Sequence, residues 1–497
     1  MKERIETNAI LLADFYKFGH IHQYPDKTEF VYSTWTARTS RFKGINDVVA
    51  FGFQGFIVEY LIDYFNKNFF KRPREEVVAE YCRIVKYCLF VDDPDASHVI
   101  ALHNLGYLPL KIQAVPEGTI VPVRVPMLTM ENTLPEFYWV TNFIETLMSC
   151  CLWQPATSAT IAHEYKKLLT YWSNRTVGNT AFIPFQGHDF SMRGLGHLGS
   201  ATTSGAGHLT SFKGTDSVPS ISYLENYYNA DVTKELVGCS VPATEHSVMC
   251  AGGKEDEYDT FDRIISKVYP TGIVSIVSDT WDLWKVLTDT IPKLKNKILA
   301  RDGKVVIRPD SGDPVDIVCG TESRNGVSPH EKGVVELLWD TFGGTITAEG
   351  YKLLDSHIGV IYGDAITLER CNEICTRLAD KGFASTNMVF GIGSFTYQYN
   401  TRDTFGFALK STHVVMDGIE HAIFKNPVTD DGVKKSQIGR VVVLKDEDGK
   451  LFFEDGFNRQ VERGMLNANQ LQIIFVDGFL MNETSLSEIR ARLDSVK

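Results

Sequence analysis

"GIVSIVSD", residues 272–279, is a short apolar run that ends in an aspartate, and the same pattern recurs further along the chain. The later runs are "KVVIRPDSGDP" at 304–314, "IGVIYGDA" at 358–365 and "MVFGIGS" at 388–394. Continuous apolar runs are typical of strands buried on both faces, and the segments between them are long enough for crossover helices. The sequence therefore predicts an α/β fold with parallel strands, in a barrel or in a doubly wound sheet.

Polar residues and glycines follow these strands directly. In both architectures, functional groups gather at the carboxyl ends of the strands, where Asp279, Asp310, Asp364 and Gly393 fall. A carboxylate there can hold magnesium through water or bind ribose hydroxyls, and Arg308 can bind phosphate as a fork. The pattern favours a sugar-phosphate site, although aspartates that only cap helices would look similar.

The two ends of the chain are richer in extended segments than its middle. At 497 residues, the chain is longer than one hydrophobic core usually supports. Residues 1–150 mix helical and extended patterns, and 401–479 consist mostly of short strand patterns, with a hairpin turn expected at 446–449. We expect a β-rich α+β domain built from residues 1–150 and 401–497, and a catalytic (β/α) domain at 151–400.

Four local patterns refine this outline. Residues 156–175 have the apolar spacing of an amphipathic helix, and Ser485 and Glu488 form a capping box at the start of the last helix. "FIPFQGHDFSMRG" at 182–194 predicts a strand that leaves into a loop, and the polar stretch 320–333 predicts an exposed loop.

Composition narrows the class of protein. With 62 acidic and 50 basic residues the formal charge is -12, which argues against nucleic acid or an anionic membrane as the main partner. The amino-terminal stretch has no secretory pattern, and the most apolar window, 137–153, is too short and polar to span a bilayer. Nine cysteines without a CxxC spacing indicate reduced thiols. We expect a cytoplasmic enzyme.

A glutamate and a histidine stand side by side in "SVPATEHS", residues 240–247. A lone histidine is more often a hydrogen-bonded structural residue than a reactive one. This octapeptide alone does not decide whether His246 and Glu245 are catalytic.

The order of the motifs along the whole chain is more informative about function than this octapeptide. "HDFSMRG", "FKGTDSV", "SVPATEHS", "SIVSD", "IRPDSGDP", "YGDA" and "FGIGS" closely resemble the nicotinamide phosphoribosyltransferases, a type II phosphoribosyltransferase family related to the nicotinate phosphoribosyltransferases. The resemblance extends from "LLADFYKFGHIHQYP" through "ENTLPEFYWVTNFIET" to "FKNPV". It implies an irregular (β/α) barrel with a second, β-rich domain. It also implies transfer of 5-phosphoribose from phosphoribosyl pyrophosphate to nicotinamide, in a homodimer whose active sites lie at the subunit interface.

The family's nicotinamide site maps onto four residues. Phe190 matches the aromatic residue that stacks on the pyridine ring, and Tyr16 matches its counterpart from the other subunit. Arg193 and Asp216 match the pair that contacts the amide. An aspartate can accept a hydrogen bond from a carboxamide but would repel the carboxylate of nicotinate, so Asp216 favours nicotinamide. The alternative is that Asp216 only caps a helix.

The resemblance also assigns catalytic and phosphate-binding roles. His246 matches a histidine that is phosphorylated by ATP, and Glu245 and Asp279 would orient it or bind magnesium, with Asp310 as a second ligand, directly or through water. The phosphoribose and pyrophosphate contacts implied by the resemblance are Arg308, Asp310, Gly363, Asp364, Gly393, Ser394, Arg38, Arg402, Lys410 and Lys425. The chain departs from the family at "GIGSF", where Ser394 and Phe395 replace glycines of a "GSGGG" loop.

Three other functions remain open. A nicotinate phosphoribosyltransferase of the same fold would accept the acid as well as the amide. A non-catalytic binding or signalling protein could keep the scaffold without the activity. A barrel phosphatase or aldolase would need a catalytic lysine or a metal-ligand set at the strand ends, which the sequence does not show.

Overall fold

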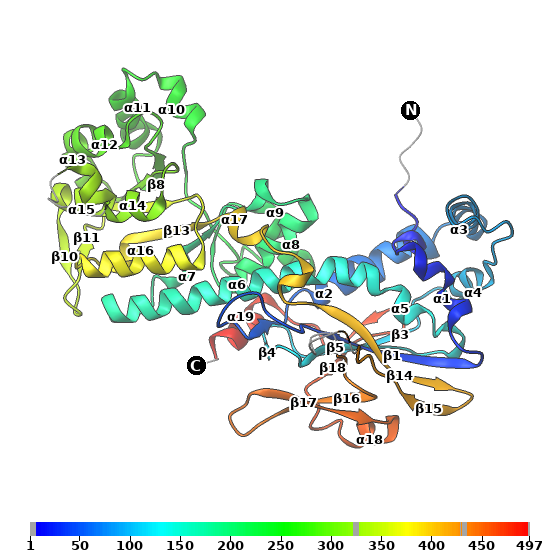
Figure 1. Ribbon diagram of the computed structural model, residues 1–497. Helices are drawn as coiled ribbons and strands as arrows, with labels where there is room; N and C mark the ends of the chain where they lie inside the picture. Colours follow the sequence, from blue (N-terminus) through cyan, green and yellow to red (C-terminus); the bar gives the residue numbers. More distant parts are fainter. Residues whose placement is uncertain (1–5, 322–327, 428, 430–434, 496–497) are drawn as a thin grey trace. The chain divides into compact units, whose positions relative to one another are not determined.

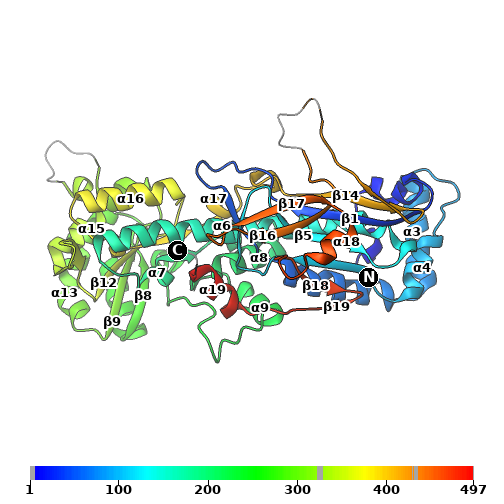
Figure 2. The ribbon, with the colours of Figure 1, turned by 90° about the horizontal axis from the view of Figure 1, so that it is seen from below.

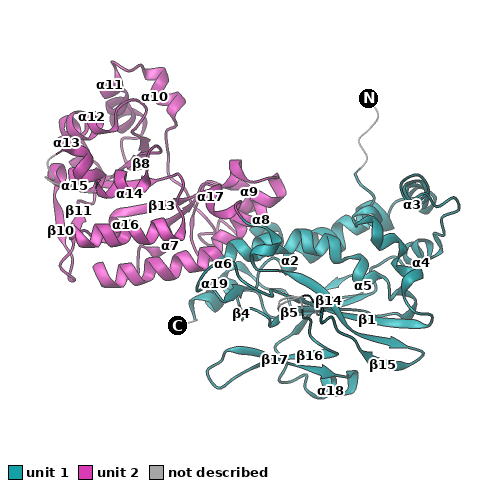
Figure 3. Cartoon of the chain, in the orientation of Figure 1, with its two compact units in different colours: residues 1–160, 223–230, 400–497 teal, residues 161–222, 231–399 magenta. Residues whose placement is uncertain are grey.

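The chain folds into two compact units, which Figure 3 colours separately. The computed structural model describes residues 6–321, 328–427, 429 and 435–495. Unit 1 comprises Met1–Thr160, Tyr223–Ala230 and Asn400–Lys497, and unit 2 comprises Ile161–Ser222 and Asp231–Tyr399. The first boundary, between Thr160 and Ile161, falls within helix α6, Glu145–Thr176.

Unit 2 is built on a six-stranded sheet with the order β7-β6-β13-β12-β9-β8, and every neighbouring pair is parallel. Figure 2 shows β8, β9 and β12 side by side. The central strands are buried because both faces are covered, as the continuous apolar runs predicted. The bounds are β6 (Gly187–Asp189), β7 (Gly214–Thr215), β8 (Gly272–Val277), β9 (Gly303–Arg308), β12 (Ile358–Tyr362) and β13 (Met388–Ile392).

An irregular segment joins the two edge strands. Cys239 bridges to Gly214 of β7, and Ala243 bridges to Ser275 of β8, both in parallel register. Pro242 lies between the two bridges and has no N–H to donate, so this segment cannot form a regular strand. The sheet thereby curls into an irregular (β/α) barrel, which confirms the expected fold class. "SVPATEHS" is the stretch that closes it.

Helices connect the strands of unit 2. In α16, Cys371, Ile374, Cys375 and Leu378 form a buried stripe, which explains the helical spacing of the two cysteines by packing. The helical segments are α7 (Ile183–Gln186), η6 (Met192–Gly194), α8 (Leu198–Leu209), α10 (His246–Gly252), α11 (Glu257–Arg263), η7 (Ile264–Val268), α12 (Leu283–Lys285), η8 (Val286–Thr290), α13 (Ile291–Leu299), α14 (Pro314–Cys319), α15 (Pro329–Phe342), α16 (Leu368–Asp380), η9 (Ser385–Asn387) and α17 (Ser394–Tyr397). A short hairpin pairs β10 (Gly344–Ile346) with β11 (Lys352–Leu354).

Unit 1 contains a seven-stranded antiparallel sheet with the order β15-β14-β1-β5-β3-β18-β19. Strand β1 (Thr28–Thr36) pairs with both β14 (Ala408–Met416) and β5 (Pro126–Asn132), so the two ends of the chain share one sheet. This confirms the second, β-rich domain. The other strands are β2 (Asp47–Val49), β3 (Leu110–Ala114), β4 (Ile120–Pro122), β15 (Ile419–Ala422), β16 (Arg440–Lys445), β17 (Leu451–Phe457), β18 (Gln472–Val476) and β19 (Phe479–Leu480).

The helical segments of unit 1 are mostly short, as the ribbon in Figure 1 shows. The helix α9 (Val218–Tyr227) crosses the unit boundary, and Tyr223 and Tyr228 pack against the helix that contains Gly55. The others are η1 (Ala9–Leu11), η2 (Phe15–Gly19), α1 (His20–Gln23), α2 (Phe53–Phe56), η3 (Ile57–Tyr64), η4 (Asn66–Phe70), α3 (Arg74–Cys88), α4 (Ser97–Leu105), η5 (Pro135–Phe137), α5 (Val140–Phe143), η10 (Arg402–Thr404), α18 (Arg459–Gly464) and α19 (Leu486–Asp494).

Local predictions had mixed outcomes. The 446–449 turn joins β16 to β17, and the Ser485–Glu488 capping box opens α19, as predicted. The strand expected across 182–194 is wrong in part. Ile183–Gln186 form α7, because Pro184 suits the first turn of a helix, and only β6 is extended. Much of the predicted loop at 320–333 lies outside the described residues, but α15 begins within it. No helix among the described residues is long and apolar enough to cross a membrane.

Candidate active site

A cavity of about 590 Å³ opens in unit 2 where the parallel strands end. It brings together ten residues singled out from the sequence, which lie more than two hundred positions apart at the extremes. They are Phe190, Arg193, Asp216, His246, Arg308, Asp310, Gly363, Asp364, Gly393 and Ser394. Of the strand-end aspartates, Asp310 and Asp364 therefore face one pocket, as expected for a barrel site, whereas Asp279 is not among its lining residues.

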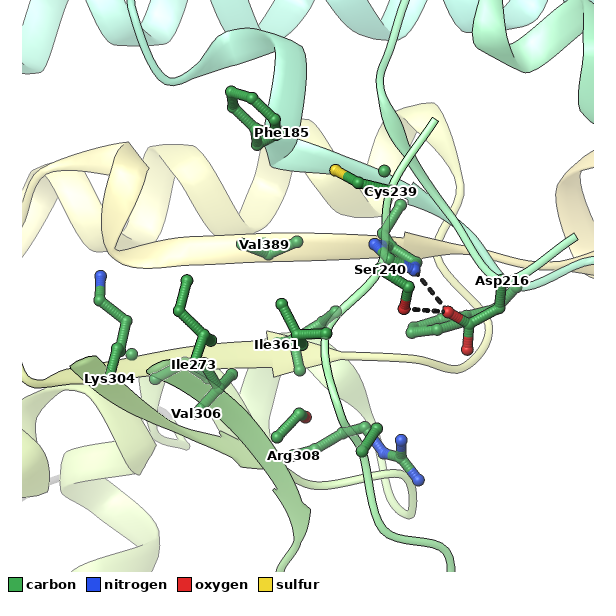
Figure 4. Close-up of a pocket in the computed structure, with 18 of the residues that line it drawn as sticks. Phe185, Asp216, Cys239, Ser240, Ile273, Lys304, Val306, Arg308, Ile361 and Val389 are labelled. Atoms are coloured by element: carbon green, nitrogen blue, oxygen red, sulfur yellow. Dashed lines mark hydrogen bonds and ion pairs between the residues drawn. The ribbon is translucent and has the colours of Figure 1, made fainter. Parts of the chain in front are cut away.

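A second cavity of about 390 Å³ adjoins the first, since both are lined by Phe190, Asp216 and Arg308. Figure 4 shows Asp216 and Arg308 at one end of it and Lys304 at the other. Its wall is mainly apolar, with Phe185, Ile273, Val306, Ile361 and Val389 among the lining side chains. Burial lowers the pKa of Lys304, partly offset by Asp355. A flat, uncharged ring fits the apolar part of this space.

Phe190 owes its position to two glycines. A Cβ on Gly391 would lie 2.6 Å from Phe190 Cδ2, and a Cβ on Gly363 would lie 3.5 Å from the same atom. The Phe190 N–H donates to the Ile392 carbonyl at 3.0 Å, which ties the residue to β13. The ring can lie against the sheet only because these positions carry no side chain.

Asp216 is held as a carboxylate by two neighbours that the sequence analysis missed. His188 Nε2 lies 2.9 Å from its Oδ1, and Ser240 Oγ donates to the same oxygen at 2.5 Å. Burial alone would raise the pKa of Asp216, but these hydrogen bonds, with Arg308 nearby, hold that pKa below its usual value. His188 could have been suspected, because residues i and i+2 of a strand share a face and Phe190 follows it at that spacing.

His246 is the first residue of α10, directly after the segment that closes the barrel. Its Nδ1 lies 3.2 Å from Thr280 Oγ1, and its Nε2 lies 3.8 Å from Asp279 Oδ1. Glu245 directs its carboxylate to the Ser247 hydroxyl instead. Thr280 and Asp279 are thus the residues that orient the imidazole in this structure, and Thr280 was missed because a threonine after a strand has no distinctive signal.

Arg308 and the carboxylates around it form a compact charged group. Arg308 Nη2 donates to the Thr244 carbonyl at 2.8 Å, and its Nε lies 3.4 Å from Asp310 Oδ2. The Asp310 N–H donates to Asp279 Oδ2 at 3.0 Å. Burial raises the pKa of Asp310, and Arg308 opposes this while Asp279 and Asp364 add to it. These carboxylates repel one another, so the group would be stabilised by a cation.

The residues fit a magnesium ion that is bound partly by its substrate. Among the described residues, no group of three or more histidine, cysteine or acidic side chains is arranged to hold a metal by itself. The Asp279 side chain is only 4% exposed, and its Oδ1 has no hydrogen-bond partner. Magnesium commonly takes one or two carboxylates and completes its shell with phosphate oxygens and water. Asp279 and Asp310 can supply these carboxylate ligands.

The loop at "GIGSF" accommodates its serine through a glycine elsewhere. A Cβ on Gly194 would lie 2.3 Å from Ser394 Cβ and 2.2 Å from Ser394 Oγ, so the serine side chain occupies space that an alanine at 194 would need. Gly393 and Ser394 both remain in the lining of the larger cavity.

Unit 1 has a basic cavity of its own, of about 390 Å³. Arg38 and Lys410, both predicted from the sequence, line it together with Arg124 and Lys435, which were missed. Burial lowers the pKa of Lys410; Glu145 counteracts this, whereas Arg38 and Lys425 reinforce it. Arg124 and Lys435 carry no motif around them, and only the fold reveals that they face the same space.

Two more predicted residues belong to unit 1. Tyr16 on η2 is 59% exposed, and Lys17 Nζ lies 5.1 Å from its ring centroid. Lys17 pairs with Glu145 at 2.5 Å, and Lys410 Nζ lies 3.8 Å from the other oxygen of the same carboxylate. Glu145 therefore links the predicted ring-stacking segment to a predicted phosphate-binding lysine. Arg402 lines none of these three cavities, and its Nη2 lies 3.6 Å from Asp403 Oδ1.

Comparison with known proteins places these features in a family. The model of the "Nicotinate phosphoribosyltransferase (NAPRTase) family" matches residues 185–466, and that of the "Nicotinamide phosphoribosyltransferase, N-terminal domain" matches residues 8–112. The chain belongs to the nicotinate phosphoribosyltransferase family. Within this family it falls among proteins named nicotinamide phosphoribosyltransferase. One from Acinetobacter baylyi is 49% identical over 98% of this chain and 97% of the relative, and one from Xanthomonas campestris pv. campestris is 31% identical over 99% of both.

Two solved structures share the fold at low identity. The nicotinate-nucleotide pyrophosphorylase from Pyrococcus furiosus has a TM-score of 0.55 and 16% identity, covering 99% of this chain and 96% of the other. The human nicotinic acid phosphoribosyltransferase has a TM-score of 0.51 and 15% identity, covering 97% of this chain and 93% of the other. These likenesses support the type II phosphoribosyltransferase architecture.

Proposed function

We propose that this protein transfers 5-phosphoribose from phosphoribosyl pyrophosphate to nicotinamide, forming nicotinamide mononucleotide and pyrophosphate in NAD salvage. The observation that carries the proposal is the Asp216 carboxylate, held anionic by His188 and Ser240 where the apolar cavity meets the charged one. An anionic acceptor at that point suits a carboxamide and disfavours a carboxylate. The names of the relatives agree with this choice.

The reaction needs little proton chemistry from the protein. The pyridine nitrogen would attack the anomeric carbon of the ribose as the bond to pyrophosphate breaks, and no proton has to leave that nitrogen. Stacking on Phe190 would align the ring and contribute about 0.5–1.5 kcal/mol beyond burial. Arg308 would stabilise the departing negative charge, and Asp310 and Gly363 would bind the ribose. Arg193 would contact the amide from the rim of the larger cavity.

Magnesium and a second subunit complete the proposed site. Magnesium, held by Asp279 and Asp310 and by the pyrophosphate, would neutralise charge on the leaving group. We further propose a homodimer in which Tyr16 comes from the partner, together with some of the unit 1 cations Arg38, Arg402, Lys410 and Lys425. The basic cavity of unit 1 supports this, because a chain of net charge -12 binds such anions only through locally gathered cations.

His246 would couple ATP hydrolysis to the transfer. Its Nε2, the nitrogen that faces Asp279, would take the γ-phosphoryl group, so that a N–P bond forms as the P–O bond to ADP breaks. Glu245 would act through the start of α10, since it directs its carboxylate to Ser247. We expect His246→Ala to retain slow transfer and to lose stimulation by ATP. Equal stimulation of the variant and the parent would contradict this role.

The proposed setting is the cytoplasm, with no nucleic-acid or membrane partner. The nine cysteines of the described chain are free, which agrees with a reducing compartment. The acidic charge agrees with small anionic substrates bound in a pocket rather than with a polyanion bound on a surface.

Steady-state turnover with nicotinamide and with nicotinate, each with and without ATP, tests the proposal. We expect a strong preference for nicotinamide in kcat/KM, and higher turnover when ATP is present. Comparable kcat/KM for nicotinate would instead identify a nicotinate phosphoribosyltransferase. If neither base gave a mononucleotide with phosphoribosyl pyrophosphate and magnesium, a non-catalytic binding protein would be the better interpretation.

A further inference from the structure

A buried carboxylate lies directly behind the two residues that would contact the base. Asp189 is the last residue of β6, is completely buried and lines neither cavity of unit 2. Phe190 follows it in the chain, and Asp216 follows the neighbouring strand β7, which pairs with β6 in parallel register. Asp189 thus stands between the loops that carry Phe190 and Asp216, although it does not reach the cavities itself.

Each oxygen of this carboxylate holds one of the two loops. Oδ1 accepts hydrogen bonds from the Ser191 N–H at 2.9 Å and from Ser191 Oγ at 2.6 Å. Oδ2 accepts from Ser217 Oγ at 2.6 Å. Ser191 is the residue after Phe190, and Ser217 is the residue after Asp216. The backbone adds another link, since the Asp189 carbonyl accepts from the Asp216 N–H at 3.0 Å.

The other surroundings of the carboxylate are small or uncharged. A Cβ on Gly205 of α8 would lie 3.0 Å from Asp189 Oδ2 and 2.2 Å from Ser220 Oγ. Burial lowers the pKa of His208, also on α8, to about 4, although Asp189 opposes this. This imidazole is therefore uncharged at neutral pH and does not neutralise the carboxylate. Because burying a carboxylate is costly unless donors satisfy it, the donating serines are held firmly in place.

We propose that Asp189 is a positioning residue for nicotinamide, whose carboxylate fixes the spacing between the Phe190 ring and the Asp216 carboxylate. The inference rests on the proposed function and adds what keeps the ring-stacking and amide-binding groups in register. The amide of nicotinamide is attached directly to its ring, so both groups can bind it only if their spacing is kept to about 0.5 Å. His188 and Ser240 hold the Asp216 side chain, whereas Asp189 would hold the loop on which Asp216 stands.

The test breaks the link at each of its ends in the full-length protein. Ser217→Ala removes the hydroxyl that joins the carboxylate to the loop of Asp216, and Asp189→Asn removes the charge. Ser220→Ala is the matched control, because Ser220 is also a buried serine beside this carboxylate, and its Oγ has no hydrogen-bond partner among the described residues. The readouts are kcat/KM for nicotinamide and for nicotinate, the KM for phosphoribosyl pyrophosphate, and the melting temperature. If Asp189→Asn does not fold, the two serine variants decide the question by themselves.

We expect Ser217→Ala to raise the KM for nicotinamide and to lower the preference for nicotinamide over nicotinate about tenfold, which corresponds to about 1.4 kcal/mol. This loss is smaller than the one expected from replacing Asp216 itself, because the other hydrogen bonds to that side chain remain. The KM for phosphoribosyl pyrophosphate should stay within about twofold of the parent. Asp189→Asn should lower the same preference, and the double variant should match the more affected single variant, because both changes break one link. Ser220→Ala should keep the parental preference.

Failure of the proposed function and failure of this inference give different results. If the parent does not prefer nicotinamide to nicotinate, the proposed function fails, and the positioning role fails with it. If the parent has the preference and both Ser217→Ala and Asp189→Asn keep it, only the positioning role is wrong. The positioning role is also wrong if Ser220→Ala lowers the preference as much as Ser217→Ala does, since general packing of α9 would then be responsible. A double variant whose loss is the product of the two single losses would show separate roles and would overturn the proposal as well.

Discussion

Replacing Asp216 by asparagine tests the central feature of the site with almost no change in shape. The carboxylate accepts hydrogen bonds from His188 and Ser240, and among the described residues it is the only acidic side chain that lines both cavities. A hydrogen bond to a charged group contributes about 1.5–3 kcal/mol. We therefore expect kcat/KM for nicotinamide to fall roughly 10- to 150-fold in Asp216→Asn.

The same variant should accept nicotinate better than the parent does. The substitution removes the repulsion between two carboxylates, so the ratio of kcat/KM for the two bases should fall by about two orders of magnitude. The assay is steady-state formation of each mononucleotide at fixed phosphoribosyl pyrophosphate. Asp231→Asn, at an aspartate that lines neither cavity of unit 2, is the control. If Asp216→Asn kept the parental preference, the carboxylate would not be the basis of selectivity.

Three further predictions concern packing and charge. Gly194→Ala places a methyl group on the Ser394 side chain, so it should raise the KM for phosphoribosyl pyrophosphate, and Ser394→Gly in the same chain should restore it. Arg440→Met removes the ion pair of the buried Glu462 carboxylate and the paired contacts to Glu131, which keeps Arg459 and Lys111, and it should cost about 3–5 kcal/mol in urea unfolding at pH 7. In the parent, burial would raise the pKa of Glu131, but Arg440 holds it at about 2, so this contribution to stability is present above pH 4.5 and is lost as the pH falls toward 2. Glu145→Gln removes the carboxylate that raises the pKa of Lys410 in the basic cavity. Lys410 should then lose its proton at a lower pH, so kcat/KM for phosphoribosyl pyrophosphate should begin to fall at a lower alkaline pH than in the parent.

The strands and the sheet edge that carries the site could be predicted from sequence. The runs at β8, β9, β12 and β13 are continuous in apolar residues, and only parallel strands covered on both faces bury such runs well. Once the strands are parallel, the residues that follow them must meet at one edge. This is why Asp310, Asp364 and Gly393 could be grouped before their distances were known.

The contacts that tune the site could not be predicted in the same way. Asp216 receives its hydrogen bonds from residues 28 and 24 positions away, on different elements. Ser394 fits because position 194 has no side chain, which is a relation between two loops. Short-range patterns such as hydrophobic period or capping carry no information about pairs of this kind, because the pairs arise only when the barrel closes.

The charges of Asp216 and Arg308 would also explain how an acidic chain could bind anions and still select a neutral base, as proposed. Arg308 and the imidazole of His246 lie on the side of Asp310 and Asp364, where a diphosphate with its cation would be held. Asp216 lies where this space meets the apolar cavity, and Arg308 also favours its ionised form. A base lying on Phe190 would therefore meet the negative Asp216 at its amide and the positive Arg308 toward the sugar. That gradient would turn the ring nitrogen toward the anomeric carbon, so selectivity and alignment would have the same electrostatic origin.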